Sequence, residues 1–142
     1  MPNWCFNSVN IEGSEKEIEK FKKYVSTDTS AFSLNKIIPM PDDIYRGNLG
    51  EEEKKKYGEK NWYDWSWENW GTKWDINEKE IEVESINDGE LQYTFETAWS
   101  PPDPVWKHLV NKFPKLKIEW FYQDESEEVG HILPKLSPQI FI

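Results

Sequence analysis

The sequence predicts an α+β fold, in which two helices cover one face of a four-stranded antiparallel sheet. Four segments alternate apolar and polar residues with the period of two that strands require. Two further segments carry apolar residues at helical spacing. Their order is strand, helix, strand, strand, helix, strand, with a long aromatic-rich stretch after the first helix. The length of 142 residues suits a single domain spanning 1–142.

The first strand and the first helix follow one another directly. Residues 3–11 place Val9 and Ile11 on one parity, as a half-buried strand does. Ser14 stands three residues before Glu17, which is the spacing of a helix-capping box. Apolar side chains then recur at helical intervals and predict a helix with one buried side. They are Ile18, Phe21 and Val25.

A long insertion, about residues 28–78, separates this helix from the second strand. The two prolines within 34–41 predict an extended path, and residues 51–56 fit either a short helix or a mobile loop. Five tryptophans lie within residues 62–74. Because burying a large aromatic side chain contributes roughly 1.5–3 kcal/mol, we expect most of them to pack on the domain.

The second half of the chain predicts three strands and a helix. Residues 79–86 alternate acidic and apolar side chains, and residues 87–89, Asn-Asp-Gly, are a hairpin-turn signal before the return strand. Prolines at 101–104 open a helix, and residues 115–122 form the last clear strand. The terminal Ile-Phe-Ile of 140–142 fits an added strand. The apolar residues expected to face the core are Leu91, Tyr93, Phe95, Val105, Trp106, Leu109, Val110, Phe113, Leu116, Ile118, Trp120 and Tyr122.

This order of elements is the ferredoxin-like βαββαβ pattern, a split βαβ unit. That fold orders its strands 4-1-3-2, so we expect the strands at 79–86 and 115–122 at the two edges. The parity opposite to the core places Trp4, Phe6 and Phe121 on the face that the helices leave open. Exposed rings of this kind need a cover. We therefore expect the Trp-rich insertion to lie over the open face.

Composition excludes several classes of function. The chain carries 27 acidic and 17 basic residues, a net charge of −10, whereas direct nucleic-acid and anionic-membrane binding depend on Lys and Arg. No apolar run approaches the roughly 20 residues that cross a bilayer, and the first residues do not resemble a signal peptide. A single cysteine, Cys5, suits a reducing compartment. We expect a cytoplasmic protein that binds neither nucleic acid nor membrane directly.

The residues that carry common chemistries are sparse. Cys5, His108 and His131 are scattered along the chain, without the spacing of a zinc site. The sequence holds no twelve-residue calcium loop and no glycine-rich phosphate loop. No residue near Cys5 in sequence lowers its pKa, and no pair among the acids stands out as a general acid and base. We expect no catalytic residue, no metal and no cofactor.

Two short motifs admit both a structural and a functional interpretation. Residues 69–75, Asn-Trp-Gly-Thr-Lys-Trp-Asp, fit a tight turn in which Gly71 takes a positive φ, or a ring-lined groove for a sugar, a base or a peptide. Residues 97–102, Thr-Ala-Trp-Ser-Pro-Pro, stand at a strand-to-helix junction with the same two interpretations. We favour the structural one for both.

Four blocks of the sequence resemble the YubB ferredoxin-like family of phage and plasmid proteins. They are residues 1–7 (Met-Pro-Asn-Trp-Cys-Phe-Asn), 37–41 (Ile-Ile-Pro-Met-Pro), 69–75 and 97–102, in this order and with suitable spacing. The resemblance covers nearly the whole chain and implies the ferredoxin-like fold. It implies no particular biochemical activity. It does imply an accessory gene of a mobile element, a class of gene often involved in contests with host defence.

Acidic residues gather in two segments. Residues 78–96 hold seven acids and one lysine, and residues 119–128 hold five acids and no base. Charges on edge strands discourage aggregation, which explains part of this pattern. The other interpretation is a negative surface for a basic partner, because complementary charge accelerates association and suppresses wrong partners.

We therefore hypothesise a non-catalytic accessory protein of a phage or plasmid, which binds and inhibits a defence protein in the host cytoplasm. An anti-CRISPR protein is one form of such an inhibitor. The expected partner has a basic surface, as a nucleic-acid-binding defence nuclease does, and exposed aromatic side chains would anchor it. The alternative is a small-ligand-binding domain with the Trp-rich insertion as a lid. The candidate partner-binding residues are Glu80, Glu82, Glu84, Glu90, Glu96, Asp124, Glu125, Glu127, Glu128, Trp62, Tyr63 and Trp65.

Overall fold

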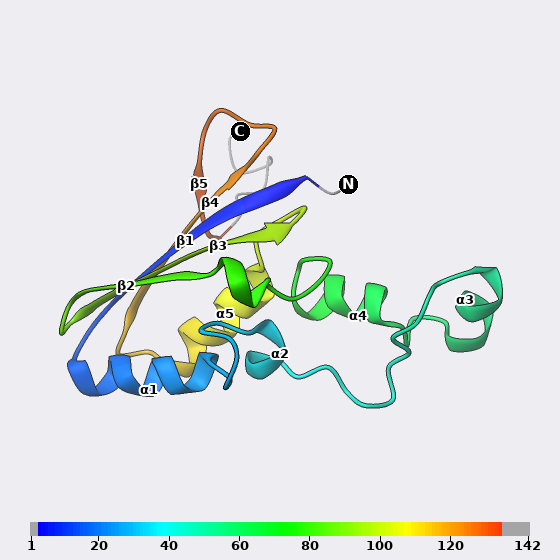
Figure 1. Ribbon diagram of the computed structural model, residues 1–142, viewed down its shortest axis with the longest axis horizontal. Coiled ribbons are helices and arrows are strands. Elements are labelled where there is room, and N and C mark those ends of the chain that lie inside the picture. Colours follow the sequence, from blue (N-terminus) through cyan, green and yellow to red (C-terminus); the bar gives the residue numbers. More distant parts are fainter. Residues whose placement is uncertain (1–2, 135–142) are drawn as a thin grey trace, which may run out of the picture.

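An antiparallel sheet and a layer of helices make up the computed structural model, which describes residues 3–134 (Figure 1). The sheet contains β1 (Trp4–Glu12), β2 (Glu82–Asn87), β3 (Glu90–Ala98), β4 (Lys117–Asp124) and β5 (His131–Ile132). The helices are α1 (Glu15–Val25), α2 (Leu34–Ile37), α3 (Glu51–Tyr57), α4 (Trp62–Asn69), the 3₁₀ helix η1 (Glu78–Glu80) and α5 (Asp103–Lys112).

The strands lie in the order β2-β3-β1-β4-β5, and every pair is antiparallel. The first four positions are those predicted for a βαββαβ chain, so the predicted α+β class and strand order are confirmed. The prediction that residues 115–122 form an edge is wrong, because β5 pairs with β4 at Phe121 and Tyr122. The strand expected at 140–142 lies outside the described residues.

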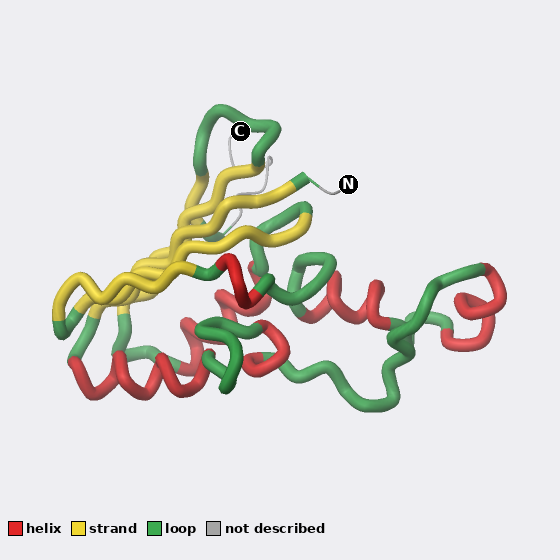
Figure 2. The backbone as a smooth tube through the Cα atoms, in the orientation of Figure 1, coloured by secondary structure: helices red, strands yellow, loops and turns green. Residues whose placement is uncertain are grey.

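The core lies between the sheet and the helix layer (Figure 2). Ser14 accepts a hydrogen bond from the Glu17 amide at 3.2 Å and begins α1, as predicted. The sides of α1 and α5 that face the sheet are buried, as the helical spacing predicts. The core residues of these two helices and of the three central strands include Val9, Ile11, Ile18, Phe21, Val25, Leu91, Tyr93, Phe95, Val105, Leu109, Ile118 and Trp120.

Part of the insertion packs in the helix layer and α3 lies far from the sheet (Figure 1), so the prediction that the insertion covers the open face is wrong. Its Phe32 is fully buried, with ring centroids 5.1 Å from those of Tyr93 and Phe95 and 5.9 Å from that of Trp120. Trp70 also belongs to this core. Phe32 of the insertion thus packs against the large rings of β3 and β4 beside Phe21 of α1, whose ring centroid is 6.5 Å from that of Phe32. The lid expected over the sheet in the small-ligand hypothesis does not lie there.

The path of residues 34–41 also differs from the prediction, because residues 34–37 form α2 instead of an extended segment. Ser33 accepts from the Lys36 amide, and the Asp75 carboxylate accepts from the amides of Leu34 (2.7 Å) and Asn35 (3.1 Å). These acceptors satisfy amides that a helix leaves unpaired in its first turn. Of the two alternatives for residues 51–56, the helix is observed, as α3.

The second strand is shorter and more exposed than predicted. Residues 78–80 form η1, capped by Asn77, and β2 begins at Glu82. Every β2 residue is exposed, including Val83 (44 %) and Ile86 (51 %). The half-buried strand expected at 79–86 is therefore wrong on two counts: Glu80 is not part of a strand, and the apolar side chains of β2 are not covered. The hairpin at 87–89 is confirmed.

In the part of the chain that the structure describes, no helix is long and apolar enough to span a membrane.

Candidate binding surface

The face of the sheet opposite the helices is open and acidic. Alternate side chains of each strand point to it, because successive residues of a strand face opposite sides. Across the middle of the sheet one row runs Glu84, Gln92, Asn10, Glu119. The residues of this open face are Phe6, Ser8, Asn10, Glu12, Glu82, Glu84, Glu90, Gln92, Thr94, Glu96, Lys117, Glu119, Phe121 and Gln123. They include six carboxylates and one lysine.

Two phenylalanines form the apolar part of the open face. Phe6 pairs across β1 and β4 with Gln123, and Phe121 lies two residues earlier on β4, so the two rings are diagonal neighbours. Phe6 is 43 % exposed and Phe121 is 37 % exposed. Gly130 lies against the Phe121 ring so closely that a Cβ there would collide with it. The loop before β5 thus holds the Phe121 ring from one side.

A depression of about 390 Å³ lies at the β2 side of the face. No ion pair within residues 3–134 involves Glu82 or Glu84, whereas Lys117 is paired with Glu119 at 3.0 Å. The carboxylates at the depression are therefore available to cations from outside. Its lining residues are Glu82, Val83, Glu84, Gln92 and Thr94.

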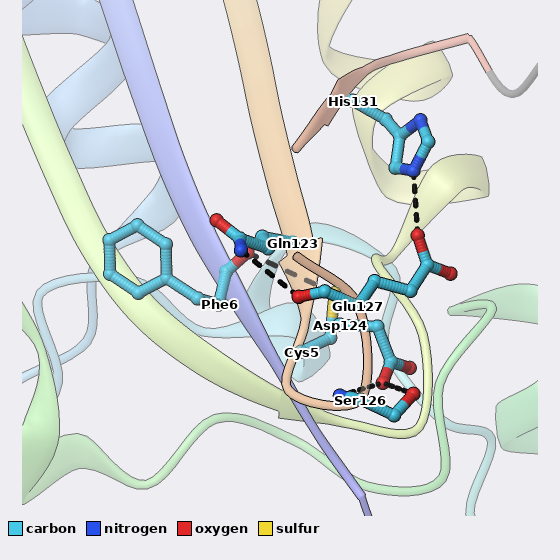
Figure 3. A network of polar contacts seen from close by, with 7 residues as sticks. All are labelled: Cys5, Phe6, Gln123, Asp124, Ser126, Glu127 and His131. Carbon is cyan, nitrogen blue, oxygen red and sulfur yellow. Dashed lines mark hydrogen bonds and ion pairs between the residues drawn. The ribbon is translucent and has the colours of Figure 1, made fainter. Parts of the chain in front are cut away.

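The second predicted acidic segment is largely engaged in local structure (Figure 3). The Asp124 carboxylate accepts hydrogen bonds from the amide and hydroxyl of Ser126 (2.8 and 2.6 Å), which hold the pKa of Asp124 below its ordinary value. Glu127 contacts the His131 ring at 2.8 Å. Glu125 accepts from the Trp4 amide at 2.9 Å. These carboxylates shape the turn between β4 and β5. Glu128 is exposed.

The predicted anchors Trp62, Tyr63 and Trp65 lie on α4, in the helix layer. Trp65 packs against Trp70 with ring centroids 5.1 Å apart, and the Trp62 indole donates to the Gly47 carbonyl at 2.9 Å. Only Tyr63 of the three is exposed. The structure does not bring these rings onto the open face with Glu82 and Glu84.

Rings from three parts of the chain gather near the start of β1. Trp4, which the sequence predicts on the open face, meets Trp74 of the insertion edge-on with ring centroids 6.3 Å apart, and the Lys73 ammonium lies 4.5 Å from the Trp74 ring. Trp99 is 43 % exposed and has φ +75°, a conformation that costs a non-glycine residue energy. Its amide donates to the Asn3 carbonyl at 2.8 Å. The contact of Trp4 with Trp74 agrees with the prediction that the insertion packs on Trp4, whereas Phe6 and Phe121 stay exposed.

The two motifs with two interpretations meet in space and support each other structurally. The Thr72 hydroxyl donates to the Ala98 carbonyl at 2.6 Å, and the Ser100 hydroxyl donates to the Gly71 carbonyl at 2.5 Å. Gly71 has φ +76°, and a Cβ there would collide with Pro104. Glycine at this position therefore lets the turn pack against the start of α5.

A buried polar network ties the start of the chain to this region. Asn7 is fully buried, and its amide nitrogen donates to the Cys5 carbonyl (3.0 Å) and the Thr97 hydroxyl (2.9 Å). Its amide oxygen accepts from the Trp120 indole at 2.9 Å. The network connects β1, β3 and β4 from the core side. It explains the presence of a polar residue in an apolar stretch.

The histidines and the cysteine do not converge. His108 on α5 is bonded to the Tyr24 hydroxyl at 2.7 Å, and the two rings are stacked. Cys5 is buried. Among residues 3–134, no group of three or more His, Cys, Asp or Glu residues is arranged to hold a metal ion.

Comparison with known families adds one finding. Residues 69–136 match the family described as a ferredoxin-like domain in Api92-like protein. The domain is ferredoxin-like. The match covers β2, β3, α5, β4 and β5 of this ferredoxin-like domain, while β1 and α1 complete its sheet and helix layer. The finer assignment to the YubB family of phages and plasmids stays a prediction. No curated protein and no solved structure shows significant similarity to the chain.

Proposed function

We propose that the protein is a non-catalytic binding protein whose open face docks onto a basic surface of a partner protein. The observation that supports this most directly is the composition of that face. Six carboxylates and a single lysine share this face with two exposed phenylalanine rings. Interfaces commonly combine a few apolar or aromatic anchors with a polar rim.

The two parts of the face have different physical roles. Phe6 and Phe121 provide apolar area that a partner can desolvate, and this area is the main source of binding free energy. Glu82, Glu84 and Glu96 provide a negative field that attracts a basic surface and repels an acidic one. Because these carboxylates are exposed, the field acts chiefly on the association rate and weakens as salt rises.

The partner that suits this face is a protein that itself binds nucleic acid, because such proteins present clustered lysines and arginines. A domain seated on that surface would exclude the nucleic acid. We therefore propose that the protein inhibits a nucleic-acid-binding defence protein in the cytoplasm of a host, as an accessory protein of a phage or plasmid. An anti-CRISPR protein is one form of this function. The proposed origin in a phage or plasmid is supported by the resemblance to YubB proteins of residues 1–7, 37–41, 69–75 and 97–102.

The proposal is tested by affinity capture from a bacterial lysate with two matched variants. E82K/E84K reverses two charges on the open face, and E59K/E68K reverses two exposed charges outside it. Both variants change the net charge by the same amount. We expect a basic protein to be captured by the wild type and by E59K/E68K, to be lost with E82K/E84K, and to elute as salt rises.

A third variant separates apolar anchoring from charge attraction. F6A/F121A removes both rings of the open face, and we expect it to release the same protein faster without a large change in association rate. Capture that is equal for the wild type, E82K/E84K and F6A/F121A contradicts the proposal. Equal loss with E82K/E84K and E59K/E68K also contradicts it, since net charge alone would then explain capture.

A further inference from the structure

The edge strand β2 is unusually accessible. Within residues 3–134 it pairs with β3 alone, and all six of its residues are exposed. In an antiparallel pair, the N–H and C=O groups of every second residue point away from the partner strand. One row of backbone donors and acceptors of β2 is therefore directed outward. Such a row is a template for a further strand.

The side chains of β2 select what can pair there. Glu82 and Glu84 lie on the open face beside the depression, and Val83 between them is exposed on the other side. A second copy of β2 aligned antiparallel would bring its glutamates close to these glutamates, and like charges on paired strands are destabilising. A strand with lysine or arginine on one side and apolar residues on the other would place opposite charges together.

We propose that β2 accepts, as an added strand at the edge of the sheet, an extended segment of the partner in which basic residues alternate with apolar ones. This inference rests on the proposed function, because it specifies how the basic partner is bound. Main-chain hydrogen bonds supply affinity in this mode, and alternate side chains supply specificity. The basic side chains of the segment lie beside Glu82 and Glu84, over the depression, and its apolar side chains lie beside Val83.

A synthetic peptide tests the inference without the natural partner. The probe is a ten-residue capped peptide of alternating lysine and valine, and the readout is amide hydrogen exchange of β2 measured by NMR. In the free protein, we expect alternate β2 amides to exchange fast because they lack an acceptor. With the peptide bound, these fast amides become protected. Binding without new protection of β2 amides overturns the inference.

Two control peptides separate pairing from simple charge attraction. Alternating glutamate and valine keeps the apolar side but reverses the charge, and we expect it not to bind. Decalysine keeps the basic charge but lacks the apolar side, and we expect weaker binding without amide protection. Equal protection by the lysine–valine and glutamate–valine peptides contradicts the charge selection.

Substitutions in β2 complete the test. E82Q/E84Q removes both carboxylates at nearly constant size, and we expect it to weaken the lysine–valine peptide by on the order of two- to thirtyfold, as two lost charge pairs imply. One of the two amides of Val83 and Glu84 points outward and is identified by its fast exchange. Proline at that position removes the outward donor and no ladder hydrogen bond, and if the position is Glu84, E84Q serves as the reference for the lost carboxylate. The outward-proline variant is expected to fold and to lose the peptide. The other proline variant removes a ladder hydrogen bond, and is expected to destabilise the hairpin.

The outcomes distinguish this inference from the proposed function. If the partner is lost with F6A/F121A but retained by the outward-proline variant, the partner uses the open face and not the edge. The inference about β2 then fails, and the proposed function stands. If the partner is retained by both variants and by E82K/E84K, the proposed function fails. Loss with the outward-proline variant, together with protection of β2 amides by the peptide, supports both.

Discussion

Replacing the buried Asn7 by alanine should destabilise the domain far more than the same change at Asn10 on the same strand. Asn7 is fully buried and makes three hydrogen bonds, whereas Asn10 lies on the open face and is partly exposed. N7A leaves the Trp120 indole N–H in the core without its acceptor. An orphaned buried donor costs about 1–3 kcal/mol, and the other two lost hydrogen bonds add about 0.5–1.5 kcal/mol each.

The expected loss for N7A is therefore about 2–6 kcal/mol in the free energy of unfolding, whereas N10A stays within about 0.5 kcal/mol of the wild type. Urea unfolding followed by tryptophan fluorescence measures both. With an m-value of about 2 kcal/mol per molar urea, a loss of about 2–6 kcal/mol lowers the midpoint by about 1–3 M. Equal midpoints for N7A and N10A would refute the assignment of the network to the core.

A double-mutant cycle isolates the orphaned donor. W120F alone removes the indole N–H and leaves the Asn7 oxygen without its donor, and N7A/W120F removes both partners. Because removing both partners of a buried hydrogen bond costs less than leaving one unpaired, we expect the double variant to be less destabilised than the sum of the two single variants. Simple additivity would show that the hydrogen bond contributes little.

Three further predictions concern stability and titration. G71A should lower the free energy of unfolding, measured with urea, more than G58A does, because both glycines have positive φ but only at Gly71 does an added Cβ collide with a neighbour. Equal losses for the two variants would contradict the close packing of that turn. D75A should lower the free energy of unfolding by about 1–2 kcal/mol, as loss of a helix cap does, and calorimetry measures this; a change within error would show that α2 does not depend on the carboxylate. Because the folded pKa of Asp124 lies below the ordinary 3.8, its carboxyl stabilises the fold above that pH, and this contribution is lost as pH falls through the folded pKa. S126A removes the hydroxyl but keeps the amide of residue 126, so it should move the pKa part of the way back to 3.8 in an NMR titration, and an unchanged pKa would exclude the Ser126 hydroxyl as a cause.

Much of the fold could be predicted because its signals are local. Ser14 and Glu17 stand three residues apart, and the buried stripe of α1 follows within the next turns. The alternation of Leu91, Tyr93 and Phe95 likewise fixes which side of β3 is buried. Such patterns need no knowledge of distant residues.

The predictions that failed depend on contacts between distant residues. Asp75 caps α2 from 41 residues away in sequence, and nothing near Leu34 indicates that acceptor. Phe32 packs against Tyr93, Phe95 and Trp120, which lie far from it in the sequence, so nothing near Phe32 indicates these partners. For the candidate site, the sequence identified Glu82 and Glu84 and placed Phe6 and Phe121 correctly. It could not show that α4 lies away from them.

The segment between Tyr45 and Trp62, which contains α3, has a practical consequence for engineering this protein. The Tyr45 amide donates to the Lys60 carbonyl at 3.0 Å, and the Trp62 amide donates to the Tyr45 carbonyl at 2.7 Å, so the segment leaves and rejoins the domain at one point. No residue of α3 is buried, and the helix lies at the end of the molecule farthest from the sheet (Figure 1). A fluorescent label, an affinity tag or a second domain spliced into residues 51–57 would therefore leave the hydrophobic core and both candidate docking sites intact.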